Sequence, residues 1–298
     1  MGLFKKKIKL VTHTGRFHAD DIFACATLQI LLGEGNVAVT RTRDAEIIEK
    51  ADYVFDVGGI HDPAIHRFDH HQKGGAGARE NGIPYAAFGL VWKEYGEKLC
   101  GSKEVAQKID EILVQAIDAG DNAVQTVAPI AGKPFPFLIQ SAFGAFKPTW
   151  KEGDNTDTGF FRAVVFAQEI LSREITQTQD YFEAKKYVAD IYQNTQDKRL
   201  IVLDKRYPWE ELLIAYPEPL LVVVPTPAGT WKAETALTSF DSFERRMKLP
   251  ESWAGLRDAD LARVTGVEDA VFCHNGRFIV VAKTKESALK LAQLALAQ

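Results

Sequence analysis

Ile8-Lys9-Leu10-Val11-Thr12-His13-Thr14-Gly15-Arg16-Phe17-His18-Ala19-Asp20-Asp21-Ile22-Phe23-Ala24 lies near the start of this 298-residue chain and introduces the pattern on which the first half is built. Its first residues read as a short strand that ends at His13. After the loop, Asp20 and Asp21 occupy positions typical of helix N-caps, and apolar residues follow at helical spacing until Gly33. The stretch therefore predicts a strand-loop-helix unit with polar groups at the carboxyl end of the strand.

The next segments repeat this alternation. Residues 36–41 read as a second strand, 45–50 as a short helix, and 53–57 as a third strand closed by two glycines. Strands alternating with helices predict right-handed crossovers and a mostly parallel sheet, with the ligand site at the carboxyl ends of the strands. His13 and Asp56 both lie near such ends.

Helical patterns dominate the middle of the chain, and strand patterns dominate from about residue 200. The predicted helices are 86–99, 102–119, 137–146, 160–193 and 287–298, and the later strands are 200–203, 212–216, 220–224, 231–233 and 278–281. The expected fold is α/β: a parallel-sheet domain over residues 1–198 that carries catalysis, and a smaller α+β domain over 199–298 that binds substrate, with the substrate in a cleft between them.

Composition limits the classes of function. The apolar fraction is 46%, the charged fraction is 26%, and the net charge is −4, which excludes a basic field over the whole surface. Three scattered cysteines form no metal or disulfide spacing. No apolar signal-peptide segment follows Lys5-Lys6-Lys7, and no run of roughly 18 to 20 apolar residues could span a membrane. We expect a cytoplasmic protein without membrane partners, and the sequence leaves its oligomeric state open, a homodimer included.

Histidines gather in the first quarter of the chain, interleaved with aspartates. Six of the seven lie there: His13, His18, His61, His66, His70 and His71. Imidazole and carboxylate together are ligands for a borderline-hard divalent metal, and adjacent histidines beside Asp69 are unusual in a core, where each ring nitrogen needs a partner. The full set of candidates comprises His13, His18, Asp20, Asp56, Asp69, His70, His71, Asp118 and Asp121.

This set exceeds the needs of one ion and predicts a two-metal site, with ions roughly 3.5 to 4 Å apart. Asp56 is the natural bridge, and the shared water becomes a hydroxide near neutral pH, a chemistry suited to phosphoesters. Mixed nitrogen and oxygen ligands favour Mn²⁺ over Mg²⁺. Plainer roles remain open: Asp20 and Asp21 as helix caps, and Asp118 or Asp121 as a residue of a helix-terminal turn.

Several motifs in combination resemble one family. They occupy residues 11–21, 41–44, 56–59, 62–63, 66–72 and 118–122, with further likeness at 148–150, 253–258 and around His274. Together they resemble the melanocyte proliferating gene family, a branch of the DHH phosphoesterase superfamily, over nearly the whole chain. The resemblance implies a two-domain α/β phosphoesterase fold and a manganese-dependent hydrolase, and eukaryotic members are described as 3′-to-5′ RNA exonucleases.

The resemblance also implies roles for single residues. One ion would be bound by His13 and His18, the other by Asp20 with either Asp121 or Asp118, and both by Asp56. His70 would ligate metal, His71 would face the substrate phosphate, and Asp69 would orient a histidine from behind.

The chain departs from the superfamily pattern at two places. The usual opening His-x3-Asp-x-Asp is here His13-x4-His18-x-Asp20, so an imidazole replaces a carboxylate at one metal. In the carboxyl-terminal region the Gly-Gly-His type substrate motif is missing from residues 276–283. The candidate phosphate contacts there are Arg257, His274, Arg277 and Lys283, although a solvent-facing strand edge explains them equally well.

The favoured function is a phosphodiesterase, most readily a 3′-to-5′ exonuclease acting on short single-stranded RNA or DNA or on nucleotides. The acidic net charge argues for short substrates, because a long electrostatic track needs more Lys and Arg on one face. A pyrophosphatase-like hydrolase with the same metals, and a non-catalytic metal-binding regulatory or nucleic-acid-binding protein, are the alternatives.

Overall fold

The computed structural model describes residues 6–239 and 242–298, so Lys5 of the amino-terminal lysine run lies outside the described residues. The chain divides into two compact units, Met1–Gln179 and Asp180–Gln298, and the division falls inside the long helix α7 (Asp157–Asn194). The boundary predicted near residue 198 lies beyond the end of this helix, and the roles predicted for the two domains stay predictions.

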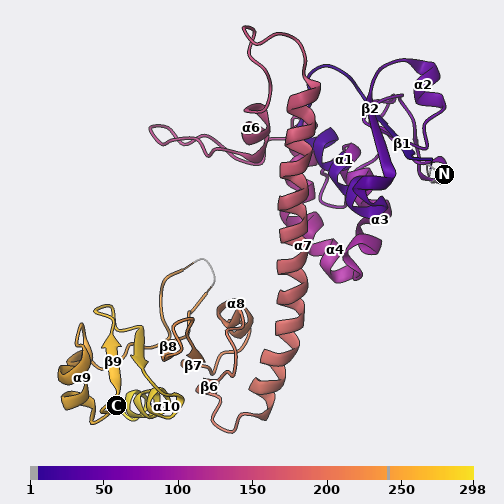
Figure 1. Ribbon diagram of the computed structural model, residues 1–298. Coiled ribbons are helices and arrows are strands. Elements are labelled where there is room, and N and C mark those ends of the chain that lie inside the picture. The colour runs from indigo at the N-terminus through magenta and orange to yellow at the C-terminus, as the bar shows by residue number, and fades with distance from the viewer. Residues whose placement is uncertain (1–5, 240–241) are drawn as a thin grey trace, which may run out of the picture. The chain divides into compact units, whose positions relative to one another are not determined.

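The first unit is built on a five-stranded sheet in the order β2-β1-β3-β5-β4. Its strands β1 and β2 are labelled in Figure 1. Strands β1 (Ile8–Thr12), β2 (Val37–Arg41), β3 (Tyr53–Phe55) and β5 (Arg67–Phe68) are parallel, and the edge strand β4 (His61–Asp62) is antiparallel to β5. This arrangement confirms the predicted parallel α/β architecture.

Helices complete the first unit. They are α1 (Ala19–Leu32), α2 (Ala45–Glu49), α3 (Ala87–Cys100), α4 (Lys103–Ile109), α5 (Gln115–Asp121), α6 (Ile139–Gly144) and the first part of α7, and a π turn (Asp110–Val114) joins α4 to α5. Helix α1 is apolar on nearly every side because it packs against α3, α5 and α6. Phe23 stacks on Phe88 at 5.2 Å and meets Phe143 edge-on at 5.4 Å, which fixes α1 among its neighbours.

Three parallel strands of this sheet end immediately before candidate site residues. His13 follows β1, Asp56 follows β3, and Asp69 follows β5. The carboxyl ends of parallel strands meet at one edge of a sheet, so these side chains are brought together although 56 positions separate the first from the last. Asp56 adopts a left-handed backbone conformation with φ of 53°, which turns its carboxylate away from the strand direction.

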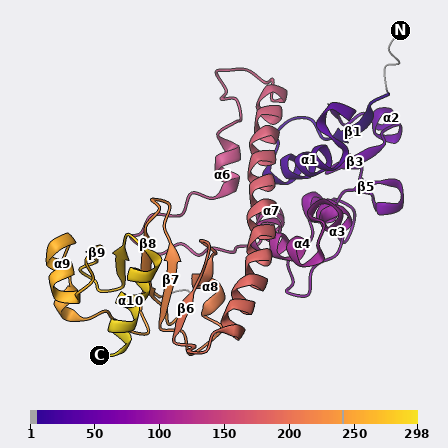
Figure 2. The same cartoon turned by 60° about the horizontal axis from the view of Figure 1, so that its bottom comes forward.

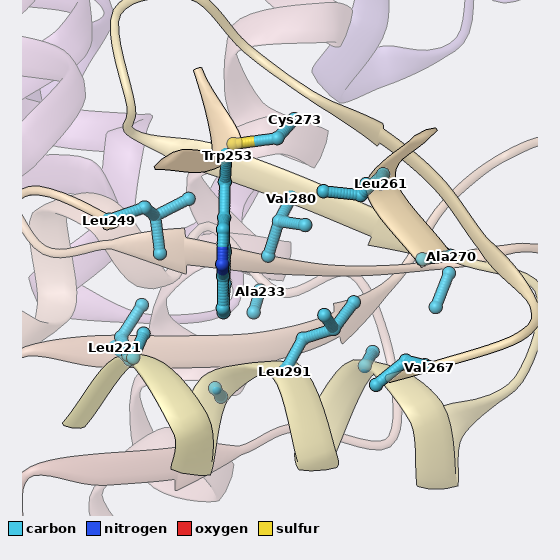
Figure 3. Packing of buried hydrophobic residues seen from close by; sticks show 14 of the residues in the cluster. Leu221, Ala233, Leu249, Trp253, Leu261, Val267, Ala270, Cys273, Val280 and Leu291 are labelled. Atoms are coloured by element: carbon cyan, nitrogen blue, oxygen red, sulfur yellow. The ribbon is translucent and has the colours of Figure 1, made fainter. Parts of the chain in front are cut away.

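The second unit is an α+β structure with its own sheet, in the order β6-β7-β8-β10-β9. Its strands are β6 (Leu200–Val202), β7 (Leu221–Pro225), β8 (Trp231–Thr235), β9 (Ala270–Cys273) and β10 (Ile279–Ala282); only β6 and β7 pair in parallel. Helices α8 (Trp209–Leu213), α9 (Asp258–Thr265) and α10 (Lys285–Leu296) pack on this sheet (Figure 2). Trp253, Val280 and Leu291 meet in its core (Figure 3).

One predicted strand of this unit is wrong. Residues 212–216 were expected to be extended, but Leu212 and Leu213 belong to helix α8. Trp209, Leu212 and Leu213 are all buried, and this i, i+3, i+4 spacing is helical. Helix α9 and strand β9, of eight and four residues, were not predicted. Within the described residues, no helix is long and apolar enough to cross a membrane.

Candidate metal centre

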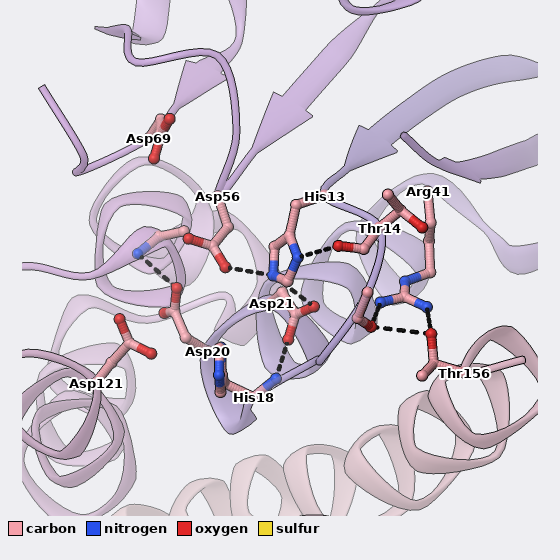
Figure 4. A network of polar contacts seen from close by, with 12 residues as sticks. His13, Thr14, His18, Asp20, Asp21, Arg41, Asp56, Asp69, Asp121 and Thr156 are labelled. Carbon is pink, nitrogen blue, oxygen red and sulfur yellow. Dashed lines mark hydrogen bonds and ion pairs between the residues drawn. The ribbon is translucent and has the colours of Figure 1, made fainter. Parts of the chain in front are cut away.

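The strand ends and the start of α1 bring potential metal ligands together in three overlapping groups within the described residues. The groups are His13, His18 and Asp56; Asp20, His70 and Asp121; and Asp56, Asp69, His70 and His71, each with ligand atoms within 4.8 Å of one another. Figure 4 shows His13, His18, Asp20, Asp56 and Asp121 around one centre, with Asp69 to one side. Asp56 and His70 are shared between groups, so the site can hold more than one cation.

His13 is almost fully buried, and its ring orientation is fixed by the chain. Its Nδ1 donates to the carbonyl oxygen of Thr14 at 3.1 Å, since a carbonyl can only accept. Its Nε2 then faces two carboxylate oxygens, 3.2 Å from Asp56 Oδ2 and 3.3 Å from Asp21 Oδ2. Burial lowers the pKa of His13, but the contacts with Asp21 and Asp56 outweigh it and raise the pKa to about 10. The Nε2 lone pair therefore needs a cation, a proton or a metal.

Asp56 is buried between two histidines. Its Oδ2 contacts His13, and its Oδ1 lies 3.5 Å from His70 Nε2 and 3.5 Å from His71 Nδ1. Burial alone would raise the pKa of this carboxyl, but His13 and His70 lower it to about 2. Asp56 thus stays ionised and presents both oxygens to the centre, as a bridging ligand would.

His70 and Asp20 complete the opposite side of the centre. His70 Nε2 lies 3.2 Å from Asp121 Oδ2, and the contacts with Asp121 and Asp56 raise the pKa of His70 to about 11 against the effect of burial. The Asp20 carboxylate accepts the backbone N–H groups of Ala87 and Phe88 at 3.0 and 2.6 Å, so it caps helix α3 from a distant part of the sequence. Burial, followed by Asp56 and Asp121, raises the pKa of Asp20.

Unpartnered polar atoms show that this donor set fits a divalent cation. Asp21 Oδ2, Asp56 Oδ1 and His70 Nε2 are buried and, beyond the histidine–aspartate contacts described above, have no hydrogen-bond partner among the described residues. All three belong to side chains that meet at this centre, and their mixture of imidazole nitrogen and carboxylate oxygen suits a transition-metal dication. A metal here would neutralise carboxylates that otherwise repel one another.

Asp69 lies behind the histidines. Its Oδ1 accepts the backbone N–H of His70 at 2.8 Å and contacts His71 Nδ1 at 2.7 Å, while its Oδ2 accepts the Gly59 N–H at 2.5 Å. The carboxylate is buried, whereas the His71 side chain is 61% exposed. Asp69 therefore fixes the loop and orients the His71 ring, and His71 lines the open side of the site.

Asp118 lies apart from the metal groups. Its Oδ2 accepts Arg79 Nη1 at 2.7 Å and its Oδ1 accepts the Gly89 N–H at 3.0 Å, and Arg79 also binds Asp110. The fully buried Asp118 carboxylate thereby joins α5 to α3. Of the two aspartates left open as a ligand, Asp121 is the one whose oxygen lies within reach of His70 and Asp20.

The predicted substrate contacts of the second unit are placed on two ends of one strand pair. His274 and Arg277 lie in the turn between β9 and β10, and the Arg257 guanidinium stacks on the Phe272 ring at 4.4 Å. Lys283 follows the far end of β10. The four side chains therefore form no single cluster, and their role in binding substrate stays a prediction.

Two residues important to the site were not singled out from the sequence. Asp21, read there as a helix cap, accepts the His18 backbone N–H at 2.7 Å and also contacts His13. Arg41 is buried and binds Gly15 O at 2.7 Å and Asp157 Oδ1 at 2.6 Å, which fastens the loop between β1 and α1 to the start of α7 (Figure 4). No local sequence pattern indicates that Arg41 forms an ion pair with Asp157.

The centre opens into a cleft of about 600 Å³ in the first unit. Its lining residues are His13, Thr14, Arg16, His18, Arg43, Asp56, His71, Gly120 and Asp121. A smaller cavity of about 180 Å³ adjoins it on the side of His18, Asp20 and Asp121 and also contacts Lys147. A substrate in this cleft would lie directly against the candidate ligands.

Comparison with known proteins identifies the family. A family model described as "Uncharacterised protein family (UPF0160)" and labelled MYG1_exonuc matches residues 9–296. The human protein named MYG1 exonuclease is 32% identical over 97% of this chain and 86% of its own length, and its mouse counterpart is 31% identical over 97% and 85%. The MYG1 protein of Chlamydia muridarum is 29% identical over 96% of both chains. These matches confirm the resemblance drawn from the motifs, and the chain belongs to the MYG1 family, UPF0160.

Proposed function

We propose that this chain is a metal-dependent phosphodiesterase that removes nucleotides from the 3′ end of short RNA or other oligonucleotides. It belongs to a family whose mammalian relatives are named exonucleases, and it is an enzyme of the hydrolase class. The observation that carries the proposal is a pair of ligand groups, His13, His18 and Asp56, and Asp20, His70 and Asp121. The two groups are joined where Asp56 Oδ1 lies 3.5 Å from His70 Nε2.

The roles of the residues follow from their positions. His13, His18 and Asp56 would hold one ion; Asp20, Asp121, His70 and Asp56 would hold the other. Two such ions, when bound, would supply a nucleophile from water near neutral pH and would stabilise both the entering and the leaving oxygen of an in-line displacement. The exposed His71, oriented by Asp69, is placed to donate to a phosphate oxygen in the cleft.

Manganese is the proposed metal. Three of the proposed ligands, His13, His18 and His70, are histidines, and imidazole suits Mn²⁺ better than Mg²⁺, which prefers oxygen alone. The replacement of a carboxylate by His18 also lowers the negative charge at the first ion. Mg²⁺ is expected to support slower turnover.

Two other functions use the same residues. A pyrophosphatase-like hydrolase would need a small closed site, whereas the cleft of about 600 Å³ is open to solvent on the side of Arg43 and His71. A non-catalytic metal-binding regulator would not need an exposed histidine held by a buried carboxylate. The geometry favours the phosphodiesterase.

One panel of assays tests the proposal. The purified chain, with Mn²⁺, Mg²⁺ or chelator, is offered a pentaribonucleotide, a longer oligonucleotide, a cyclic dinucleotide and pyrophosphate. We expect Mn²⁺-dependent release of nucleoside monophosphates from the RNA 3′ end, lost in His70→Ala. Turnover of pyrophosphate alone would support the pyrophosphatase-like hydrolase in place of the phosphodiesterase. If the protein turns over none of these substrates in a reaction that His70→Ala abolishes, both functions are refuted.

His66→Ala is the matched control. His66 lies on the same segment as His70, but its Nδ1 contacts Tyr95 Oη at 2.8 Å and its ring stacks on Tyr53, outside the metal groups. This variant should keep its Mn²⁺ content and its turnover, so a loss seen only in His70→Ala is assigned to the centre.

A further inference from the structure

The cleft beside the metal centre contains two cationic side chains that the catalytic proposal does not use. Arg16, in the loop between β1 and α1, and Arg43, after β2, both line the cleft together with His13, Asp56 and His71. Both side chains are exposed. Within the described part of the chain, neither guanidinium forms a side-chain hydrogen bond, an ion pair or a contact with an aromatic face.

Comparison with the neighbouring Arg41 shows that the position of an arginine in the fold decides whether its guanidinium has partners. Arg41 lies two residues before Arg43, yet its guanidinium is buried, bonded to Gly15 O and Asp157, and stacked on the Phe160 ring at 4.6 Å. Its terminal nitrogens Nη1 and Nη2 are occupied in holding the loop. Arg43 extends from the same strand end into the cleft with all of its donors available.

The acids of the cleft do not pair with these arginines. Asp56 contacts His13 and His70, and Asp121 contacts His70. Lys147 lines the adjoining cavity, and burial together with nearby Arg16 lowers its pKa, so two like charges stand close to each other beside the centre. Such a concentration of cations is favourable when an anion is bound between them.

The metal centre itself would hold the phosphate that reacts. Arginine presents a planar fork of donors that matches phosphate oxygens, and it is the side chain of choice where a phosphate is held but not cleaved. Arg16 and Arg43 lie in the same cleft as the ligands, so they can reach a phosphate next to the reacting one along a strand.

We propose that Arg16 and Arg43 form a binding site for the phosphate group that neighbours the scissile one, so that the cleft selects substrates with at least two successive phosphodiester linkages. This inference rests on the proposed function for the identity of the scissile phosphate. It places nucleic-acid contacts within the first unit, apart from those predicted at Arg257, His274, Arg277 and Lys283.

Binding without turnover tests the site directly. A pentaribonucleotide carrying fluorescein at its 5′ end is titrated with the full chain in EDTA, and its anisotropy is measured from 50 to 200 mM salt. We expect Arg16→Ala and Arg43→Ala each to weaken binding by about tenfold or more. The magnitude of the slope of log K against log salt should fall by about 0.7 when both arginines are replaced, the value for one phosphate contact on a single strand.

A second probe identifies the phosphate. The same RNA carries one neutral methylphosphonate at the linkage next to the 3′-terminal one. Wild-type protein should bind it at least as weakly as Arg43→Ala binds the native RNA, and Arg43→Ala should lose little further affinity on it, because the neutral linkage already removes the contact that Arg43 makes. If Arg43→Ala weakens binding of the native RNA and of the methylphosphonate RNA by the same factor relative to wild type, the inference is overturned.

Two variants complete the design. Arg173→Ala removes an exposed arginine of α7 that does not line the cleft and should leave binding unchanged. Arg43→Lys should recover part of the affinity, since it restores the charge but not the fork. If both alanine variants bind like wild type, the inference is refuted; RNA binding through these arginines without any Mn²⁺-dependent cleavage would instead refute the proposed function.

Discussion

Two carboxylate oxygens face Nε2 of His13, and exchanging one oxygen atom of Asp21 for an N–H group decides whether that nitrogen can bind metal. Asp21 Oδ2 lies 3.3 Å from Nε2 and has no other hydrogen-bond partner among the described residues. Asp21→Asn would place an N–H against the nitrogen and occupy its lone pair. We expect Mn²⁺ affinity to fall about 10- to 100-fold, measured by isothermal titration calorimetry.

Asp44→Asn is the control for this change. Like Asp21 at the start of α1, Asp44 lies at the start of a helix. It caps α2 by accepting the backbone N–H groups of Glu46 and Ile47. Asparagine can do the same, so metal affinity should not change. An Asp21→Asn protein that binds Mn²⁺ like wild type would show that His13 Nε2 is not a ligand.

Metal binding should release protons from the two histidines. In the metal-free protein the pKa values of His13 and His70 are raised to about 10 and about 11, so both rings are protonated at neutral pH. A metal must displace these protons, and its apparent affinity therefore rises with pH until both pKa values are passed. Calorimetry in buffers of different ionisation enthalpy should show close to two protons released at pH 7.5; no buffer dependence would contradict this.

At the scale of the elements, the contact between α3 and α5 supports the centre. Gly89 lies on α3 where a Cβ would overlap the Asp118 carboxylate, which is held by Arg79. Gly89→Ala must displace this buried ion pair, and we expect the free energy of unfolding to fall by about 1–3 kcal/mol. Denaturant unfolding followed by circular dichroism measures it.

Gly144→Ala provides the comparison. Gly144 ends helix α6, and nothing lies within 4 Å of a Cβ added there. Alanine favours the helix, so stability should be unchanged or rise by up to about 1 kcal/mol. If both variants are equally stable, the close approach of α3 to Asp118 does not limit the fold.

At the scale of the whole molecule, metal should stabilise one unit and not the other. The candidate ligands all belong to the first unit and join the ends of β1, β3 and β5 with α1 and α5. At 100 times the dissociation constant, a bound ion stabilises the folded state by about 2.7 kcal/mol. Hydrogen exchange should therefore slow about 100-fold in residues 13–21 and 56–71 when Mn²⁺ is added, and not in the strands β7–β10.

Asp56→Asn controls this experiment by removing the ligand shared between the groups. Hydrogen exchange of this variant in residues 13–21 and 56–71 should no longer respond to Mn²⁺. Mass spectrometry of peptic peptides resolves these segments. Protection by Mn²⁺ that is equal in the strands of both sheets would place the ion elsewhere.

Local sequence determined the alternation of strands and helices in the first unit and the gathering of histidines and aspartates at strand ends. Such inferences succeed because periodicity and the topology rules of parallel sheets act over a few residues, and His13 and Asp56 each follow a strand that the sequence predicts. The two-residue strand β5 before Asp69 was not predicted. The family resemblance, drawn from the same motifs, added the expected pairing of ligands.

Tertiary structure alone decided between residues that look alike in the sequence. Asp118 and Asp121 lie one helical turn apart, but Arg79, from a distant loop, binds the first and leaves the second facing His70. Arg41 and Arg43 differ because Asp157 reaches only one of them. Residues 212–213 form a helix because Trp209 packs into the core beside them. In each case the deciding partner is far away in the chain, and no local pattern can encode a contact that only folding creates.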